Sequence, residues 1–309
     1  MLRVQRRSVE DNLSIVAAGV AFYALLATFP GLLAVFAVYG IFFDPSDQGQ
    51  VVEQLQFLRG QLQPEAIQLL LAFLSGLAES DRSRLGFGIA GGAALTVWGA
   101  SLGLRALLRA LNVAYAEKEK RSFLERNGVA LLLTVGAIAA AFCMGLAVMS
   151  LPVLTHWFRP EPVIQRFVFY ARWPTVGLMF WLSVTVLYRY APSRAHAQWS
   201  WVSWGALFAT ALWLSASGIL AWYVAGSRHY HQAYGAIGVI VLVLAWFLVT
   251  AFSVLLGAEI NAELERQTRK DTTVGTEKPP GSRGANAADS VGASACSTSG
   301  GGFPKAGSS

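Results

Sequence analysis

The residues from Ala233 to Ala258 form one uninterrupted run without a charged side chain. As a helix, this run would extend about 39 Å at 1.5 Å per residue, whereas the hydrocarbon core of a bilayer is about 30 Å thick. An uncharged run of this length is typical of a membrane-spanning helix. It restricts the chain to folds that lie in a bilayer.

Five further runs with few or no charges predict five more spanning helices. They cover residues 13–43, 85–104, 128–151, 167–188 and 199–226, and the fourth of them contains Arg172. Charged residues make up 14% of the chain, against roughly 25% in ordinary soluble domains. The sequence therefore predicts an all-α integral membrane protein with six transmembrane helices.

The first run and the loop that follows it depart from this simple pattern. The first run is longer than one crossing needs, and Pro30 removes a backbone hydrogen bond within it, so we expect a tilted or broken helix there. In the loop 44–84, the apolar-rich residues 66–78 follow a helix start at Gln63-Pro64-Glu65. Because this segment is too short to span, we expect a short amphipathic helix on the non-cytoplasmic surface, with a re-entrant arm or a lid as alternatives.

The distribution of basic residues predicts the orientation and the domain boundary. If both termini are cytoplasmic, 17 of the 24 Lys and Arg residues lie on that side, as the positive-inside rule favours. After the last run the chain becomes rich in Gly, Ser, Ala and Thr, a composition that does not support a packed core. We expect a six-span membrane domain at residues 1–265 and a disordered cytoplasmic tail at residues 266–309.

Small residues recur at four-residue intervals in the second span. Gly88 and Gly92 are followed at this spacing by Thr96 and Ala100. Small side chains let two helices approach closely within lipid. The pattern therefore predicts close helix packing along this face.

Four polar residues are predicted to lie near the cytoplasmic boundary: Arg105, Arg189, Glu259 and Asn261. An unpaired carboxylate at this depth is costly, so Glu259 should have an ion-pair partner or a functional task, and the two arginines are candidate partners. The arginines could instead extend to the lipid headgroups. We treat the four as candidate substrate-binding residues. Whether Glu259 binds a substrate or holds helices together is left open.

Signatures of catalysis and of metal or cofactor binding are missing from the sequence. There is no P-loop, nucleophile elbow or dinucleotide fingerprint, and His229 and His231 fit no strong zinc spacing. Cys143 lies in the third span and Cys296 in the tail, so no disulfide is predicted. We expect no catalytic residues, no metal and no cofactor.

Ordered motifs along the chain resemble a known family. The clearest are Ala21-Phe22-Tyr23, Phe29-Pro30, Tyr188-Arg189-Tyr190-Ala191-Pro192, Tyr234-Gly235-Ala236-Ile237-Gly238 and Gly257-Ala258-Glu259-Ile260-Asn261-Ala262. Over about residues 8–265 the chain resembles the YihY/BrkB family of bacterial inner-membrane proteins.

The resemblance implies a six-helix inner-membrane protein with both termini inside. It adds Tyr234 and Gly235 to Pro30, Gly88 and Gly92 as positions where helices bend or pack. Some members of the family carry a virulence-factor label, and many carry an old ribonuclease BN label that is widely regarded as a misassignment.

The leading functional hypothesis is an envelope protein that moves or positions an amphipathic substrate such as a lipid, by analogy within the family. The expected partners are membrane lipids and envelope proteins, with no nucleic acid. Two alternatives stay open. One is a membrane-bound ribonuclease acting on tRNA, which the scattered cytoplasmic acids disfavour, and the other is a scaffold without transport activity.

Overall fold

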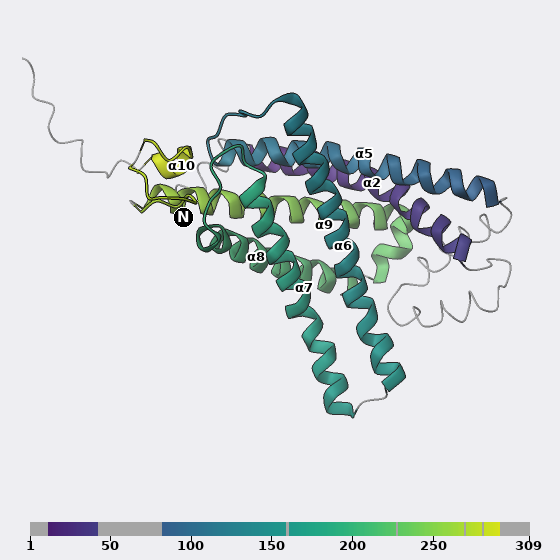
Figure 1. Cartoon of the computed structure of the whole chain (residues 1–309). Coiled ribbons are helices and arrows are strands. Elements are labelled where there is room, and N and C mark those ends of the chain that lie inside the picture. Colours follow the sequence, from purple (N-terminus) through teal and green to yellow (C-terminus); the bar gives the residue numbers. More distant parts are fainter. Residues whose placement is uncertain are drawn as a thin grey trace, which may run out of the picture.

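A computed structural model describes residues 12–42, 82–158, 161–226, 228–268, 270–279 and 281–290 of the chain, and these residues are mostly helical (Figure 1). Within these residues, six long helices precede a short one: α2 (Leu13–Phe42), α5 (Arg82–Ala114), α6 (Phe123–Phe158), α7 (Pro162–Tyr190), α8 (Trp199–Gly226), α9 (Arg228–Arg266) and α10 (Asn286–Asp289). Within the described residues, extended pairing is limited to one isolated antiparallel β-bridge. The prediction of an all-α fold is confirmed for this part of the chain.

Each predicted apolar run corresponds to one of the long helices. Five of them, α2, α5, α6, α8 and α9, contain a stretch that is long and apolar enough to cross a bilayer. Helix α7 is also long, and it carries Arg166, Arg172 and Arg189. The chain is thus a helical membrane protein, while the sixth crossing is still a prediction. The short helix expected at residues 66–78 lies outside the described residues.

Helices α2 and α5 lie side by side and run in opposite directions (Figure 1). A Cβ atom added to Gly103 would lie 3.1 Å from the Cβ of Tyr23, and one added to Gly99 would lie 3.3 Å from the Cβ of Ala27. Such small residues permit close contact between helix backbones. Close packing through the small residues of α5 is therefore present at Gly99 and Gly103.

Helices α6 and α7 form a hairpin whose joined ends project away from α2, α5 and α9 (Figure 1). Large apolar side chains are exposed along both helices, among them Leu132 and Phe142 on α6 and Phe167 and Leu178 on α7. In a bilayer these side chains would contact lipid tails, which are as apolar as the side chains themselves. The hairpin is therefore suited to a lipid environment rather than to water.

The α5–α6 connection, the α7–α8 connection and the residues that follow α9 meet at one end of the molecule. We call this end the polar end and define it as the described residues within 112–122, 190–198 and 263–290. Hydrogen bonds from the Ser193 N–H to Asn112 and from Arg194 to Glu265 join its three segments, and α10 packs there against α9 (Figure 1).

The described residues after α9 are folded against the polar end. Thr272, Thr273 and Arg283 are buried, and the β-bridge joins Thr273 to Ala197 in the connection between α7 and α8. Here the structure differs from the prediction of a disordered tail. Backbone groups of the α7–α8 connection form hydrogen bonds with this part of the tail, and amino-acid composition cannot reveal such bonds. Residues 291–309 lie outside the described part, and the domain boundary at residue 265 is still a prediction.

Candidate functional site at the polar end

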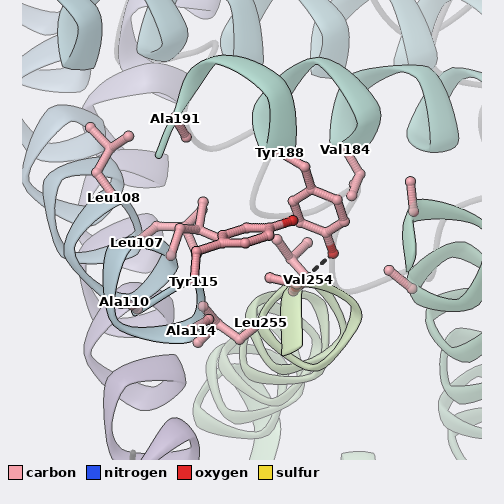
Figure 2. Packing of buried hydrophobic residues seen from close by; sticks show 14 of the residues in the cluster. Leu107, Leu108, Ala110, Ala114, Tyr115, Val184, Tyr188, Ala191, Val254 and Leu255 are labelled. Atoms are coloured by element: carbon pink, nitrogen blue, oxygen red, sulfur yellow. Dashed lines mark hydrogen bonds between the residues drawn. The ribbon is translucent and has the colours of Figure 1, made fainter. Parts of the chain in front are cut away.

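Two buried tyrosines connect the apolar core to the polar end (Figure 2). Tyr115 follows α5 and Tyr188 lies in the last turn of α7. The Tyr188 hydroxyl donates a hydrogen bond to the carbonyl oxygen of Val254 on α9, at 2.5 Å. Burial raises the pKa of Tyr115 above its ordinary value, so this side chain is neutral at physiological pH.

A buried ion pair between Arg194 and Glu265 lies beside Tyr115. The two terminal nitrogens of the guanidinium donate to the two carboxylate oxygens at 2.5 and 2.9 Å, and both side chains are 1% exposed. The guanidinium also lies over the Tyr115 ring, 4.0 Å from its centroid. Burial disfavours the charged form of Arg194, but the Glu265 carboxylate outweighs this effect, and the pKa of Arg194 is raised. The pair therefore stays charged and fixes the α7–α8 connection to the end of α9.

The connection between α5 and α6 is tied to the end of α7. Asn112 accepts a hydrogen bond from the backbone N–H of Ser193 at 2.8 Å and donates to Glu119 at 3.0 Å. Arg121 donates to three backbone carbonyl oxygens at 2.9 to 3.0 Å, those of Tyr190, Ala191 and Pro192. The last carbonyls of a helix lack partners within it and carry partial negative charge, so a guanidinium is stabilising there.

Helices α8 and α9 touch backbone to backbone near the polar end. A Cβ atom on Gly257 would lie 2.6 Å from the carbonyl oxygen of Gly205 and would also collide with the Tyr188 hydroxyl. Beside this contact, Asn261 accepts a hydrogen bond from the N–H of Gly205 at 2.7 Å and donates to the carbonyl oxygen of Val202 at 3.0 Å. The crossing thus combines two glycines with one buried amide.

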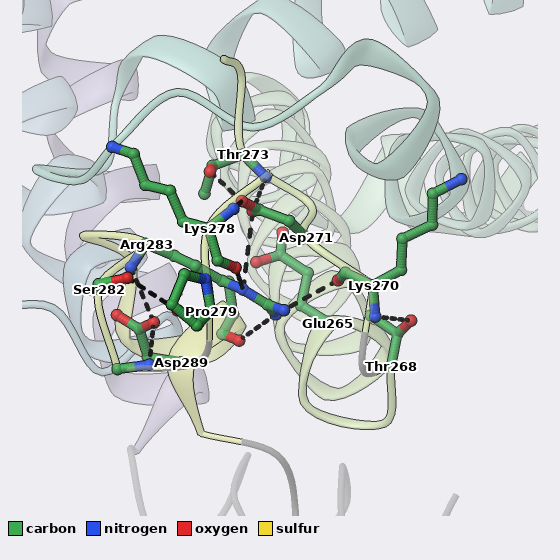
Figure 3. A network of polar contacts seen from close by, with 12 residues as sticks. Glu265, Thr268, Lys270, Asp271, Thr273, Lys278, Pro279, Ser282, Arg283 and Asp289 are labelled. Carbon is green, nitrogen blue, oxygen red and sulfur yellow. Dashed lines mark hydrogen bonds and ion pairs between the residues drawn. The ribbon is translucent and has the colours of Figure 1, made fainter. Parts of the chain in front are cut away.

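Arg283 is the centre of the folded tail segment (Figure 3). This buried side chain donates to the carbonyl oxygens of Lys278 at 3.0 Å, Ala288 at 2.9 Å and Lys270 at 3.3 Å. Its Nε atom lies 3.9 Å from a carboxylate oxygen of Asp271. Burial alone would raise the pKa of Asp271, but backbone hydrogen bonds outweigh this effect and lower the pKa. One arginine thus joins both halves of the segment.

The folded tail is held to the rest of the polar end largely by backbone hydrogen bonds. The N–H of Gln198 donates to Thr272 at 2.8 Å, and the N–H of Val274 donates to His196 at 2.9 Å. On the opposite side, the N–H of Asn286 donates to the Glu117 carboxylate at 2.5 Å. These contacts close the polar end over the buried ion pair.

The structure does not bring the four predicted site residues into one cluster. Glu259 and Asn261 are both buried in α9; Asn261 bonds to α8, and Glu259 interacts electrostatically with Tyr115. Arg105 instead bonds to Ser101 on its own helix, at 3.1 Å to the carbonyl and 2.9 Å to the hydroxyl. Arg189 donates to the carbonyl of Ala197 at 3.0 Å and lies 4.3 Å from the Trp199 ring centroid. Substrate binding by these four residues is still a prediction.

The predicted bending and packing positions are only partly described. Helix α2 continues through Pro30 without a break, which disfavours the broken alternative. Gly92 is buried, and its carbonyl accepts a hydrogen bond from the Thr96 hydroxyl at 2.7 Å. Gly88, Tyr234 and Gly235 lie within helices, but their packing is outside the described part.

A shallow basic pocket of about 360 Å³ opens at the polar end. The pocket is formed by both interhelical connections and by the folded tail, and its lining comprises Lys120, Arg121, Ser193, Arg194, Ala195, His196 and Gly284. The lining contains no carboxylate. In the sequence, the basic residues of this lining predict only the orientation of the chain in the membrane. They do not predict a pocket, because nothing in the sequence shows that residues 120 and 196 become neighbours.

The described residues contain no group of three or more His, Cys, Asp and Glu side chains that could hold a metal ion. The polar end instead presents a buried ion pair, a buried tyrosine and a basic pocket. Such an arrangement can bind an anion or hold helix ends together.

The long apolar helices and the closed polar end define a helical, multi-pass membrane protein. The sequence profile of the family described as "Virulence factor BrkB" matches residues 4–281. The chain therefore belongs to the virulence factor BrkB family.

Named relatives agree with this membership. The chain is 30% identical over 262 residues to YfkH of Bacillus subtilis (strain 168), which is named as ribonuclease-like, covering 82% of this chain and 90% of YfkH. It is 22% identical over 260 residues to UPF0761 membrane protein MS0032 of Mannheimia succiniciproducens, covering 84% of this chain and 86% of that protein. A UPF0761 membrane protein of Psychromonas ingrahamii is 24% identical over 269 residues, 86% of this chain and 87% of that protein. No solved structure matches the chain.

Proposed function

We propose that the protein crosses the bacterial inner membrane six times, with the polar end in the cytoplasm, and that it moves or positions an amphipathic molecule such as a lipid. The cytoplasmic orientation is supported by the basic residues that gather at the polar end, among them Lys118, Lys120 and Arg121. Membership in a family with membrane-protein relatives supports the membrane setting.

The observation that carries the proposal is that hydroxyl side chains within the helices form hydrogen bonds with the backbone of their own helix. Thr134, Thr185, Thr210 and Ser253 each donate to the carbonyl oxygen four residues earlier on their own helix, at 2.7 to 2.8 Å. A hydrophilic solute crossing a bilayer would need polar groups to replace its water, and the hydrogens of these four hydroxyls are already donated to the backbone. An amphipathic molecule can keep its tails in the lipid and follow the exposed apolar surface of α7, which ends at the polar end.

A leaflet-accessibility assay in liposomes tests this proposal. Reconstituted protein should bring a fluorescent phospholipid from the inner leaflet to an external quencher faster than protein-free liposomes do. Leu182→Gln, on the exposed surface of α7, should slow this movement, whereas Leu207→Gln on the exposed surface of α8 is the matched control. A rate equal to that of empty liposomes would contradict lipid movement and favour a scaffold.

The same assay decides the role of Glu259. Glu259→Gln keeps the size of the side chain and removes its charge. Slower lipid movement at an unchanged unfolding temperature would support substrate binding, whereas slower movement with a lowered unfolding temperature would assign Glu259 to holding the helices together.

The ribonuclease alternative rests on one relative, YfkH of Bacillus subtilis, which is named as ribonuclease-like. It predicts that purified protein cleaves tRNA in a metal-dependent manner and that replacing both Glu259 and Glu263 abolishes cleavage. Cleavage that survives both substitutions would point to a contaminant.

A further inference from the structure

We infer that the basic pocket at the polar end, together with the exposed surface of α7 that leads to it, binds one anionic phospholipid of the adjacent leaflet. The phosphate would lie in the pocket and an acyl chain along α7. This inference rests on the proposed function in one respect, namely that α7 crosses the membrane, and it does not require that the lipid be moved.

The pocket has the charge that a phosphate requires. Lys120 and Arg121 contribute two cationic side chains to its lining. The Arg121 guanidinium already donates to three backbone carbonyl oxygens, so it contributes charge, and the Lys120 ammonium is the donor for a ligand. The charge of Arg194 is already balanced by Glu265, so it adds little. An anionic group that replaces part of its water with ammonium donors is stabilised by charge-assisted hydrogen bonds.

Two acidic residues lie near the pocket, and one of them pairs with its lysine. One carboxylate oxygen of Glu117 lies 3.7 Å from the Lys120 ammonium, and the other accepts the hydrogen bond from the backbone of Asn286. Glu119 accepts hydrogen bonds from Asn112 and from the N–H of Arg121. The Lys120 side chain is 63% exposed and that of Glu117 is 3% exposed, so a ligand in the pocket can reach the ammonium more readily than the carboxylate.

His196 connects the pocket to the membrane-facing surface. It lines the pocket, and its ring packs edge-on against the Tyr190 ring at a centroid distance of 5.3 Å. Tyr190 in turn lies 6.4 Å from the Trp199 ring, and both aromatic side chains are exposed. Tyr and Trp are enriched at the level of lipid headgroups because their rings are apolar and their tips are polar.

An apolar ridge on α7 leads away from Tyr190. Leu178, Leu182, Val186 and Tyr190 follow one another at four-residue spacing and are each between 39% and 55% exposed. Residues four apart lie one above the other on a helix. Twelve residues of helix rise about 18 Å, which is close to half of a hydrocarbon core of about 30 Å. The ridge is thus as long as an acyl chain of one leaflet.

The volume of the pocket also limits its ligand. At about 360 Å³ it lies near the small end of the range of ligand sites, which is about 300–1,000 Å³. It can accept a headgroup but not an entire lipid. The acyl chains must lie outside it, and the ridge on α7 is the apolar surface that begins at its edge.

The test uses the full-length protein in neutral detergent and follows its unfolding temperature during separate titrations with phosphatidylglycerol, phosphatidylcholine and inorganic phosphate. Phosphatidylglycerol should raise the unfolding temperature at concentrations where phosphatidylcholine and phosphate do not. Equal shifts with the two lipids would overturn the requirement for a negative headgroup. An equal shift with inorganic phosphate would show a free-anion site and overturn the lipid.

Matched variants locate the site. Lys120→Gln should raise the phosphatidylglycerol concentration for half of the shift about fivefold, the effect of one basic side chain near an anionic membrane surface. Lys118→Gln, an exposed residue of the same connection outside the pocket lining, should leave it unchanged. Val186→Asn should weaken phosphatidylglycerol binding through the ridge. An equal loss in Lys118→Gln, or none in Lys120→Gln, would overturn the assignment.

The result can be separated from the outcome of the transport assay. If liposomes show no lipid movement while phosphatidylglycerol binding still depends on Lys120, the site stands and the proposed movement fails. If lipids move but phosphatidylglycerol binding is insensitive to Lys120 and Val186, the movement stands and the site fails.

Discussion

Arg194 and Glu265 lie 71 residues apart in the chain and form two hydrogen bonds within the closed polar end. Neither residue belongs to the boundary cluster predicted from the sequence. Their pairing decides where the α7–α8 connection lies against α9, and the basic pocket uses Arg194 as one of its walls.

Replacing Glu265 by Gln should destabilise the protein strongly. The substitution leaves the Arg194 charge buried without its counter-charge, a change that costs about 3–5 kcal/mol. A lowered midpoint of chemical or thermal unfolding in detergent would measure it. The double variant Arg194→Met/Glu265→Met should recover much of the loss because it removes both charges, and Glu277→Gln, at an exposed position of the tail, is the control. A Glu265→Gln protein as stable as the wild type would contradict the role of the pair.

Gly257→Ala should also destabilise the protein, by about 1–3 kcal/mol for an overpacked contact. The added methyl group would collide with the Gly205 backbone, which cannot move aside as a flexible side chain would. Gly218→Ala is the matched control, because a Cβ atom there meets nothing within 4 Å. Equal unfolding midpoints for the two variants would show that α8 and α9 can separate without cost.

Arg283→Gln should release the folded tail while the membrane helices stay intact. The guanidinium is the group that holds carbonyls from both halves of the segment together. Hydrogen exchange should become faster at the N–H groups of Gln198 and Val274, which join the tail to the α7–α8 connection. Lys278→Gln should leave exchange unchanged, since residue 278 is exposed and contributes backbone atoms to the network.

Docking of the tail should weaken in acid. Because the pKa of Asp271 is lowered in the folded state, its ionised form contributes stability that is fully present above the ordinary value of 3.8 and is lost as the pH falls through the lower folded value. Exchange at Val274, corrected for its intrinsic pH dependence, should therefore accelerate below about pH 3.8. Asp271→Asn should show weak docking at every pH. The same acid response in that variant would assign it to another group.

Cysteine labelling should show whether α6 and α7 both cross the membrane. With Cys143 and Cys296 replaced by Ser, Glu161→Cys at the tip of the α6–α7 hairpin should react with an impermeant maleimide from outside the cell. Lys118→Cys at the polar end should react only after the membrane is opened. Labelling of both positions from the same side would contradict the six-span topology.

The apolar runs were sufficient to predict which segments are helical, but not where the helices end. The run at 233–258 lies within α9, which extends from Arg228 to Arg266, because polar residues continue a helix when no breaker intervenes. Hydropathy predicts how deep a residue lies in a bilayer, but not the direction in which its side chain points. It therefore predicted that Arg105 and Glu259 lie at the same boundary, but not that Arg105 bonds to Ser101 on its own helix.

The folded tail and the basic pocket could not be predicted from the sequence for a related reason. Composition indicates whether a segment can form a hydrophobic core of its own. Residues 270–279 are instead held by hydrogen bonds to the α7–α8 connection, about 75 residues earlier in the chain. A weak signal was present in the charged residues Glu263, Glu265 and Arg266 at the end of α9, because all three form ion pairs in the structure.

The contact between Gly205 and Gly257 also constrains how α8 can move. Gly205 lies about 9 Å along a helix of 28 residues, which leaves about 32 Å on the far side of the contact. If the contact acts as a fulcrum, α8 is a lever with arms in a ratio of about one to three and a half. A shift of 1 Å at the polar end, where the pocket lies, then becomes a displacement of about 3.5 Å at the opposite end of the helix.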